Sequence, residues 1–179
     1  MRTLKWVVVI ASIVALGFTQ EWIKVALNFH IEKGMTEPGF FEMTPDQRIA
    51  ILEEIKNDNP FDYYQSHETI DLYAYLSLSQ LKALKWVLTL GFVVIFYFLN
   101  RWIIDILIHV KILRKWLTYT YIGAFSTALL IYALGVLTGY SDLFYMVSRK
   151  MVGALQSPIP AIMTWAGWRL YTDHNSVKK

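Results

Sequence analysis

The chain has 179 residues, of which 55% are hydrophobic, 16% are aromatic and only 17% are charged, and its formal net charge is +3. Soluble domains carry roughly 25% charged residues, so this composition predicts an integral membrane protein. The sequence contains no cysteine, which excludes disulfides, thiolate metal sites and every mechanism that uses a cysteine nucleophile.

Four apolar segments follow one another along the chain, and each is long enough to cross a bilayer. A helix needs about 20 apolar residues to span about 30 Å of hydrocarbon. The segments cover 6–29, 83–108, 116–137 and 151–171. The third has no charge and carries small residues that let helices pack closely. We therefore predict an all-α integral membrane fold, with four transmembrane helices in a single membrane domain over 1–179.

The first segment, 6–29, has the build of a signal anchor. Basic residues in MRTLK precede the apolar run WVVVIASIVALGF, as they do in a secretory signal. No small-x-small cleavage site follows this run, and apolar residues resume at Trp22. We expect an uncleaved anchor, with a cleaved signal peptide as the alternative.

Polar side chains recur along one face of the same segment. Glu21, Lys24 and Asn28 are three and four residues apart, which places them on one side of a helix. One interpretation is a surface that docks a partner helix or lines a polar pathway. The other is a local ion pair between Glu21 and Lys24, with the Lys24 ammonium reaching the headgroups.

The distribution of charge predicts how the chain crosses the membrane. The segment 31–82 holds ten acidic residues against four basic ones, whereas the basic residues of both termini and of 101–115 far outnumber their acidic ones. The positive-inside rule then places 31–82 outside and both termini in the cytoplasm, in a bacterial inner membrane. The basic residues flank apolar runs and form no single stripe, so we expect no nucleic-acid partner.

The extracytoplasmic segment 31–82 is expected to be mostly helical. Thr44-Pro45-Asp46-Gln47 has the pattern of a capping box and predicts an amphipathic helix over 45–58. Ser79 is expected to cap the second membrane helix. His30, Glu32, His67 and Glu68 could be assembled into a metal site, but their spacing matches no known ligand pattern. We predict neither a metal nor a cofactor.

The second apolar segment ends in three polar residues at intervals of four. Arg101, Asp105 and His109 therefore share a helical face. They could form a titrating relay, or the carboxylate and guanidinium of Asp105 and Arg101 could pair where the helix leaves the bilayer. We expect the pair, because basic residues at 111–115 follow directly. Such a basic turn also favours anionic lipid headgroups on the cytoplasmic side.

The fourth segment contains the sequence LQSPIP. Pro158 and Pro160 each remove a backbone N–H donor, and Ser157, which precedes a proline, is pushed away from helical geometry. We predict a kink at 157–160, with Gln156 and Ser157 placed to pair with freed backbone groups. A broken membrane helix can serve as a binding or gating element, as in transporters. It can also be a packing kink, or a junction between an interfacial helix over 142–155 and a shorter inserted segment.

Three stretches of the chain carry a family resemblance. NFHIE, LSLSQLKALKWVLTL and YMVSRKMVGALQSPIPAIM resemble small multispanning proteins associated with bacterial exosortase-type surface-sorting systems. The resemblance implies an accessory protein that acts beside a membrane sorting or export enzyme, and it implies no site residues.

The function we expect is that of a non-enzymatic accessory or structural subunit of a bacterial inner-membrane complex, with other membrane protein subunits and the lipid bilayer as partners. The alternative is a small transporter or channel component that uses the broken fourth helix and the polar stripe of the first segment. An intramembrane enzyme built on Asp105 and His109 is a third hypothesis.

Overall fold

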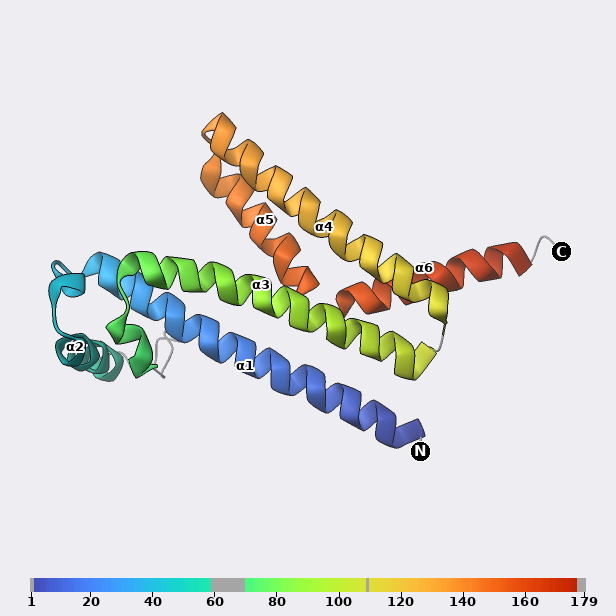
Figure 1. Cartoon of the computed structure of the whole chain (residues 1–179), viewed down its shortest axis with the longest axis horizontal. Coiled ribbons are helices and arrows are strands. Elements are labelled where there is room, and N and C mark those ends of the chain that lie inside the picture. Colours follow the sequence, from blue (N-terminus) through green and yellow to red (C-terminus); the bar gives the residue numbers. More distant parts are fainter. Residues whose placement is uncertain (1, 59–69, 109, 177–179) are drawn as a thin grey trace. The chain divides into compact units, whose positions relative to one another are not determined.

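A computed structural model describes residues 2–58, 70–108 and 110–176, and these residues form helices and no strand. The α-helices are α1 (Arg2–Thr36), α2 (Pro45–Asp58), α3 (Leu78–Ile103), α4 (Lys111–Thr138), α5 (Ser141–Leu155) and α6 (Ile159–Ser176) (Figure 1). Two 3-10 helices, η1 (Phe40–Glu42) and η2 (Asp71–Tyr75), lie between α1 and α3, and a π-helix, η3 (Ile104–Ile108), extends α3.

Three helices are long and apolar enough to cross a membrane. They cover Leu4–Thr36, Leu78–Ile106 and Lys111–Thr138, and they correspond to the first three predicted spans. Only 6%, 28% and 17% of their apolar windows is buried inside the chain, so their remaining surface needs lipid or protein to cover it. The predicted fourth span, 151–171, is not among them, because the chain leaves helical geometry between Leu155 and Ile159.

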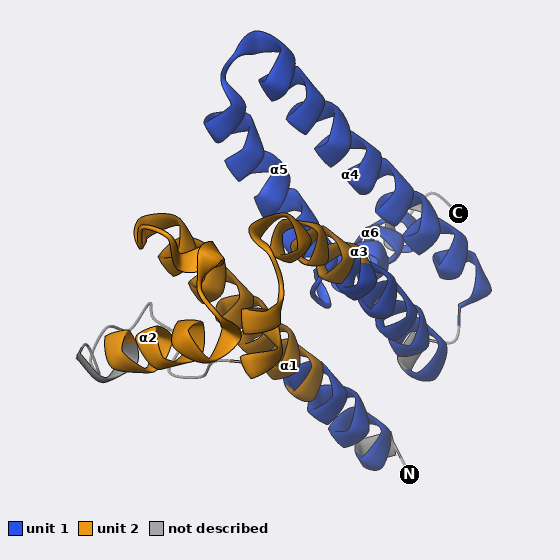
Figure 2. Ribbon diagram, turned by 60° about the vertical axis from the view of Figure 1, so that its left-hand side comes forward, with its two compact units in different colours: residues 1–14, 91–179 blue, residues 15–90 orange. Residues whose placement is uncertain are grey.

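The chain divides into two compact units, each with its own core (Figure 2). Unit 1 comprises residues 1–14 and 91–179, and unit 2 comprises residues 15–90.

Unit 2 is built around the second half of α1. Ala26, Leu27 and Ile31 of α1 pack against Tyr73 of η2 and Leu81 of α3. A second cluster joins Phe29, Phe40 and Leu52, which brings η1 and α2 onto the same helix. Burial of these apolar side chains is the main source of stability for the unit.

Capping boxes begin two helices of unit 2. At α2, the Thr44 amide donates to Gln47 Oε1 at 3.0 Å and the Gln47 amide donates to Thr44 Oγ1 at 3.4 Å. At α3, the residue that caps is Ser77 and not Ser79. The Ser77 amide donates to Gln80 Oε1 at 2.8 Å, and the Gln80 amide donates to Ser77 Oγ at 3.3 Å. A capping box needs a glutamine or glutamate three residues after the cap. Gln80 stands at that distance from Ser77, so Ser77 is the cap.

Unit 1 contains a helical hairpin of α4 and α5, which lie side by side in Figures 1 and 2. Gly139, with φ of 77°, ends α4 in the left-handed conformation that favours glycine. Gly135 allows the close approach of the two helices, because a side chain there would overlap Phe144. Ser148 Oγ donates to the Ala128 carbonyl at 2.9 Å. The main core of the unit includes Leu113, Leu117 and Leu155.

Candidate functional site

The helix break brings buried polar groups of unit 1 together. α5 ends at Leu155, Gln156 leaves helical geometry with φ −90° and ψ 41°, and α6 begins at Ile159. Ser157 Oγ donates to the Ala154 carbonyl at 2.6 Å and accepts the Ile159 amide at 3.2 Å. The Ser157 hydroxyl therefore caps both the C-terminal end of α5 and the N-terminal end of α6.

The prolines at the break occupy positions where a missing N–H does no harm. The Pro158 carbonyl accepts the Ile162 amide at 3.2 Å, which is the first hydrogen bond of α6. Pro160 lies in the first turn of α6, where backbone N–H groups have no partner within the helix. Pro160 is buried, and Gln156 is only 7% exposed. The break is therefore a packed joint between two helices.

Asn100 of α3 holds this joint together. Its side chain is fully buried, and its Nδ2 lies 2.8 Å from each of three acceptors, the Phe96 carbonyl, the Ser157 carbonyl and the Tyr121 hydroxyl. Its Oδ1 accepts the Ala161 amide at 3.3 Å. Asn100 thus caps the start of α6 from another helix, and both of its polar atoms are used.

Tyr121 of α4 completes the network. Its hydroxyl donates to the Leu155 carbonyl at 2.8 Å, which is one of the last carbonyls of α5 and has no partner within its helix. Hydrogen bonds from α3 and α4 therefore satisfy backbone groups on both sides of the break, as a helix broken in an apolar environment requires.

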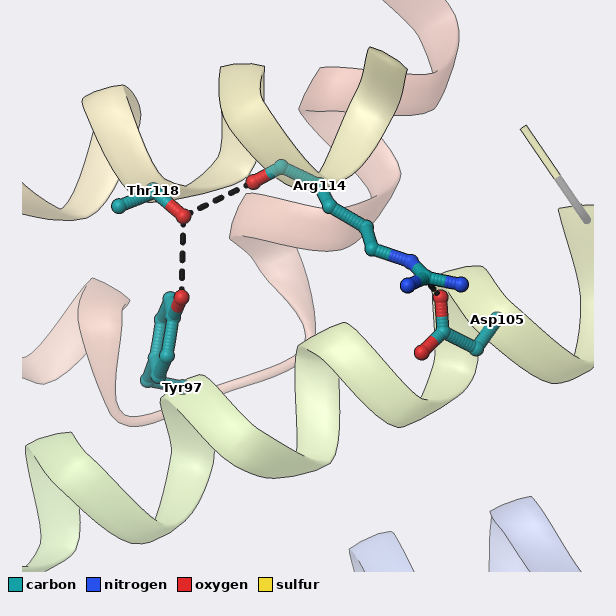
Figure 3. A network of polar contacts seen from close by, with 4 residues as sticks. All are labelled: Tyr97, Asp105, Arg114 and Thr118. Carbon is teal, nitrogen blue, oxygen red and sulfur yellow. Dashed lines mark hydrogen bonds and ion pairs between the residues drawn. The ribbon is translucent and has the colours of Figure 1, made fainter. Parts of the chain in front are cut away.

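The polar residues expected where the second span ends are arranged differently (Figure 3). Asp105 pairs with Arg114 of α4, and not with Arg101. The pairing with Arg101 assumed an α-helical interval of four residues, but Asp105 lies in the π-helix η3, whose wider turn changes the direction of its side chain. Arg101 is exposed, and His109 lies outside the described residues.

A second polar contact joins α3 and α4 beside this pair. The hydroxyls of Tyr97 and Thr118 are 2.9 Å apart, and Thr118 Oγ1 also donates to the Arg114 carbonyl at 2.9 Å (Figure 3). The Tyr97 ring packs edge-on against Tyr121. The contacts of Arg114 and Thr118 thus align the beginning of α4 with the end of α3.

The polar stripe of α1 lies in unit 2. Glu21 is exposed, whereas Lys24 and Asn28 are half-buried. Within the part of the chain that the structure describes, the Glu21 carboxylate forms neither a hydrogen bond nor an ion pair. The ion pair of Glu21 with Lys24, which was one of the two interpretations of this stripe, is therefore not formed.

Arg48 of α2 is a buried cation that sequence reasoning missed. Its side chain is 9% exposed, and its guanidinium donates to four carbonyls at 2.6 to 3.1 Å. These are the carbonyls of Phe41, Met43, Ala74 and Leu76. The group also lies 5.5 Å from the Phe41 ring centroid, within cation–π range. Arg48 therefore ties η1 and η2 to α2.

His30 and Tyr73 form a buried contact near the same loops. His30 Nδ1 lies 3.0 Å from the Ala26 carbonyl, so it donates, and Nε2 has no hydrogen-bond partner among the described residues. The Tyr73 ring meets the imidazole edge-on at 5.5 Å. Burial raises the pKa of the Tyr73 hydroxyl, which keeps the phenol neutral.

No protein-family model, curated protein or solved structure matches the chain. The sequence pointed to Gln156, Ser157, Pro158 and Pro160, but not to Asn100 and Tyr121, which hold the break together. The only signal for Asn100 was an amide at the end of the otherwise apolar run WVLTLGFVVIFYFLN.

Proposed function

We propose that the chain is a multi-pass membrane protein that serves as a non-enzymatic accessory or structural subunit of a membrane complex. The three helices that could span a membrane leave most of their apolar surface uncovered by the chain itself. Lipid covers such surface, and so do the helices of other membrane proteins. The resemblance to small proteins of exosortase-type systems makes surface-protein sorting or export the process we propose for this complex.

The hydrogen bonds of Asn100 are the observation that best supports a structural role for this chain. A ligand site at a broken helix leaves backbone groups free to bind the transported species. Here the Ser157 and Leu155 carbonyls and the Ala161 amide are all paired with groups of the chain itself. The break is therefore better suited to hold the bundle in one conformation than to bind a solute.

The contacts of unit 1 support a revised course for the fourth passage. α5 runs back along α4, since Ser148 contacts Ala128 and Phe144 contacts Gly135. α6 then contacts η3 and α4, at the end of the unit where the basic residues 111–115 lie. We propose that α5 makes the fourth passage, so that both termini lie in the cytoplasm of a bacterial cell and the basic turn faces anionic headgroups of the inner membrane.

Isolation of the intact complex tests this function. We expect the tagged full-length chain, extracted from native membranes in mild detergent, to migrate with other membrane proteins in a defined ratio. Photocrosslinking from 31–82 should label the same partner proteins in intact membranes. A chain that is a monomer at every detergent concentration, with no crosslinked partner, would contradict the proposal.

A small transporter or channel component is the second candidate, and the helix break itself is the observation that favours it. Purified chain in lipid vesicles would then conduct a solute or ion, and Gln156→Leu would abolish that flux because it removes the buried amide at the break. Flux that is absent, or unchanged in Gln156→Leu, would reject a pathway at this site.

A further inference from the structure

α5 carries two adjacent cations, Arg149 and Lys150, that the fold leaves without a partner. Both side chains are exposed. Among the described residues neither side chain forms a hydrogen bond or an ion pair. Ser148, directly before them, faces α4 and is buried, so Lys150 lies on the side of α5 opposite to α4 and Arg149 lies on its flank.

The register of the α4–α5 hairpin places these cations far from either end of α4. Ser148 contacts the carbonyl of Ala128, and Ala128 is the midpoint of the charge-free stretch 116–140. Arg149 and Lys150 follow within about 3 Å along the helix axis. If α4 spans the membrane, its middle is about 15 Å from each headgroup layer, so the headgroups nearest to Lys150 are about 12 Å away. Neither side chain can reach that far.

Among the described residues, the chain also offers an unpaired carboxylate near the middle of its first predicted span. Glu21 is exposed on α1 and has no partner among the described residues. It follows the charge-free run from Trp6 to Gln20, and it lies about 5 Å from the middle of the predicted span 6–29, toward the extracytoplasmic end. Side chains lean toward the N-terminus of their own helix. The Glu21 side chain therefore leans toward the middle of its own span, and the side chains of Arg149 and Lys150 lean toward the N-terminal end of α5.

The surface around the cations suits a second helix. Leu143, Met146 and Val147 are exposed by 58%, 47% and 39%, and with Lys150 they follow a helical spacing of three and four residues. Gly153 and Ala154 are exposed one turn further along, and a Cβ on Gly153 would meet nothing within 4 Å. Small residues at such a position let a neighbouring helix approach closely.

We propose that α5 is an interface between copies of this chain, in which Glu21 of one copy pairs with Arg149 and Lys150 of the next. This inference rests on the proposed membrane location. Charged groups inside a bilayer pair with one another or line a wet cavity, and these are opposite charges that each lie near the middle of an apolar stretch. The contact joins two different surfaces, α1 and α5, so it is heterologous and generates a ring when it closes.

Disulfide crosslinking between copies tests this contact directly, because the chain contains no cysteine of its own. Two full-length variants with different tags, Glu21→Cys and Arg149→Cys, are produced together in membranes and then oxidised. We expect a disulfide-linked dimer that carries both tags. The matched control replaces Glu21→Cys with Trp22→Cys, an exposed neighbour on another face of α1, and should give several-fold less dimer.

Charge reversal provides an independent measurement of the same contact. Glu21→Lys or Lys150→Glu alone should lower the association of purified chain in lipid vesicles about tenfold, because like charges then meet inside the membrane. The double variant should restore association. Restoration also shows that the single variants failed at the interface and not in folding.

The possible outcomes separate this inference from the proposed function. Chain that stays in the membrane after alkaline extraction but gives no dimer with both tags overturns the contact alone. In that case a carboxylate on another protein, or water, covers the cations. Chain that is monodisperse in buffer without detergent overturns the membrane location as well.

Discussion

The Asn100 side chain stabilises the helix break between α5 and α6. It takes part in hydrogen bonds to α4, to the break and to α6. We predict that Asn100→Leu lowers the free energy of unfolding by about 1–3 kcal/mol, because the buried Ala161 amide and the partly buried Ser157 carbonyl lose their partner. Unfolding by SDS in mixed micelles, followed by tryptophan fluorescence, measures this change.

Tyrosine variants on α4 provide the control for that measurement. Tyr121→Phe removes a hydroxyl that bonds Asn100 and the Leu155 carbonyl, whereas Tyr119→Phe removes one from a side chain that is 68% exposed. Only Tyr121→Phe should destabilise the chain. Its effect should not add to that of Asn100→Leu, since residues in one network show coupling of roughly 0.5–3 kcal/mol. Additive effects would show that the network does not act as a unit.

Arg48 gives a second prediction at the residue scale. Arg48→Met keeps much of the apolar side chain but removes the donors to four carbonyls. Hydrogen bonds to charged groups contribute about 1.5–3 kcal/mol, so we expect faster hydrogen exchange of the backbone amides in η1 and η2. Mass spectrometry of the exchanged peptides measures it. Arg101→Met, which changes an exposed arginine, should leave the exchange of these peptides unaltered.

The α4–α5 hairpin depends on a glycine at the element scale. Gly135→Leu should destabilise the chain by about 1–3 kcal/mol, because the new side chain would overlap Phe144 in a packed interface. Gly123→Leu is the matched control on the same helix, since a Cβ there would meet nothing within 4 Å. Thermal unfolding in detergent compares the two variants. Equal stability of both would mean that α5 does not pack against α4 at Gly135.

The start of α3 gives another prediction at this scale. Ser77→Ala removes the capping hydroxyl and should lower stability by about 0.5–2 kcal/mol. Ser79→Ala, two residues later, should have a smaller effect, because its hydroxyl contacts only that of Ser77 among the contacts found at this cap. Circular dichroism during thermal unfolding compares the two variants. A larger loss in Ser79→Ala would place the cap at Ser79.

Local features of the fold could be predicted from the sequence, and contacts between distant residues could not. The capping box at Thr44 and the prolines at 158 and 160 act within a few residues of themselves, so their pattern is visible in the sequence. Asn100 and Ala161 meet only after three helices have packed. The pairing of Asp105 with Arg114 depended on a π-helix, which the apolar sequence around it does not signal.

At the scale of the whole molecule, the number of passages depends on which side of the membrane α6 occupies. Three helices alone would leave the turn at Gly139 and everything after it outside, if the N-terminus is cytoplasmic. A fourth passage by α5 returns α6 to the side of the basic turn. α5 has only 15 residues, or about 22 Å of helix, which is shorter than the hydrocarbon core of about 30 Å. Its passage therefore requires the residues of the break to extend it and the bilayer to become thinner locally.

Single-cysteine labelling decides between these topologies. Lys115→Cys should react with a membrane-impermeant maleimide only after the cells are opened, and Glu42→Cys should react in intact cells, because the positive-inside rule places them on opposite sides. We predict that Arg169→Cys behaves like Lys115→Cys, since Trp168 beside it packs against the core cluster that includes Ile104 and Leu113. Labelling of Arg169→Cys in intact cells would show that α5 turns back within the membrane. Arg149 and Lys150 would then lose their place near its middle.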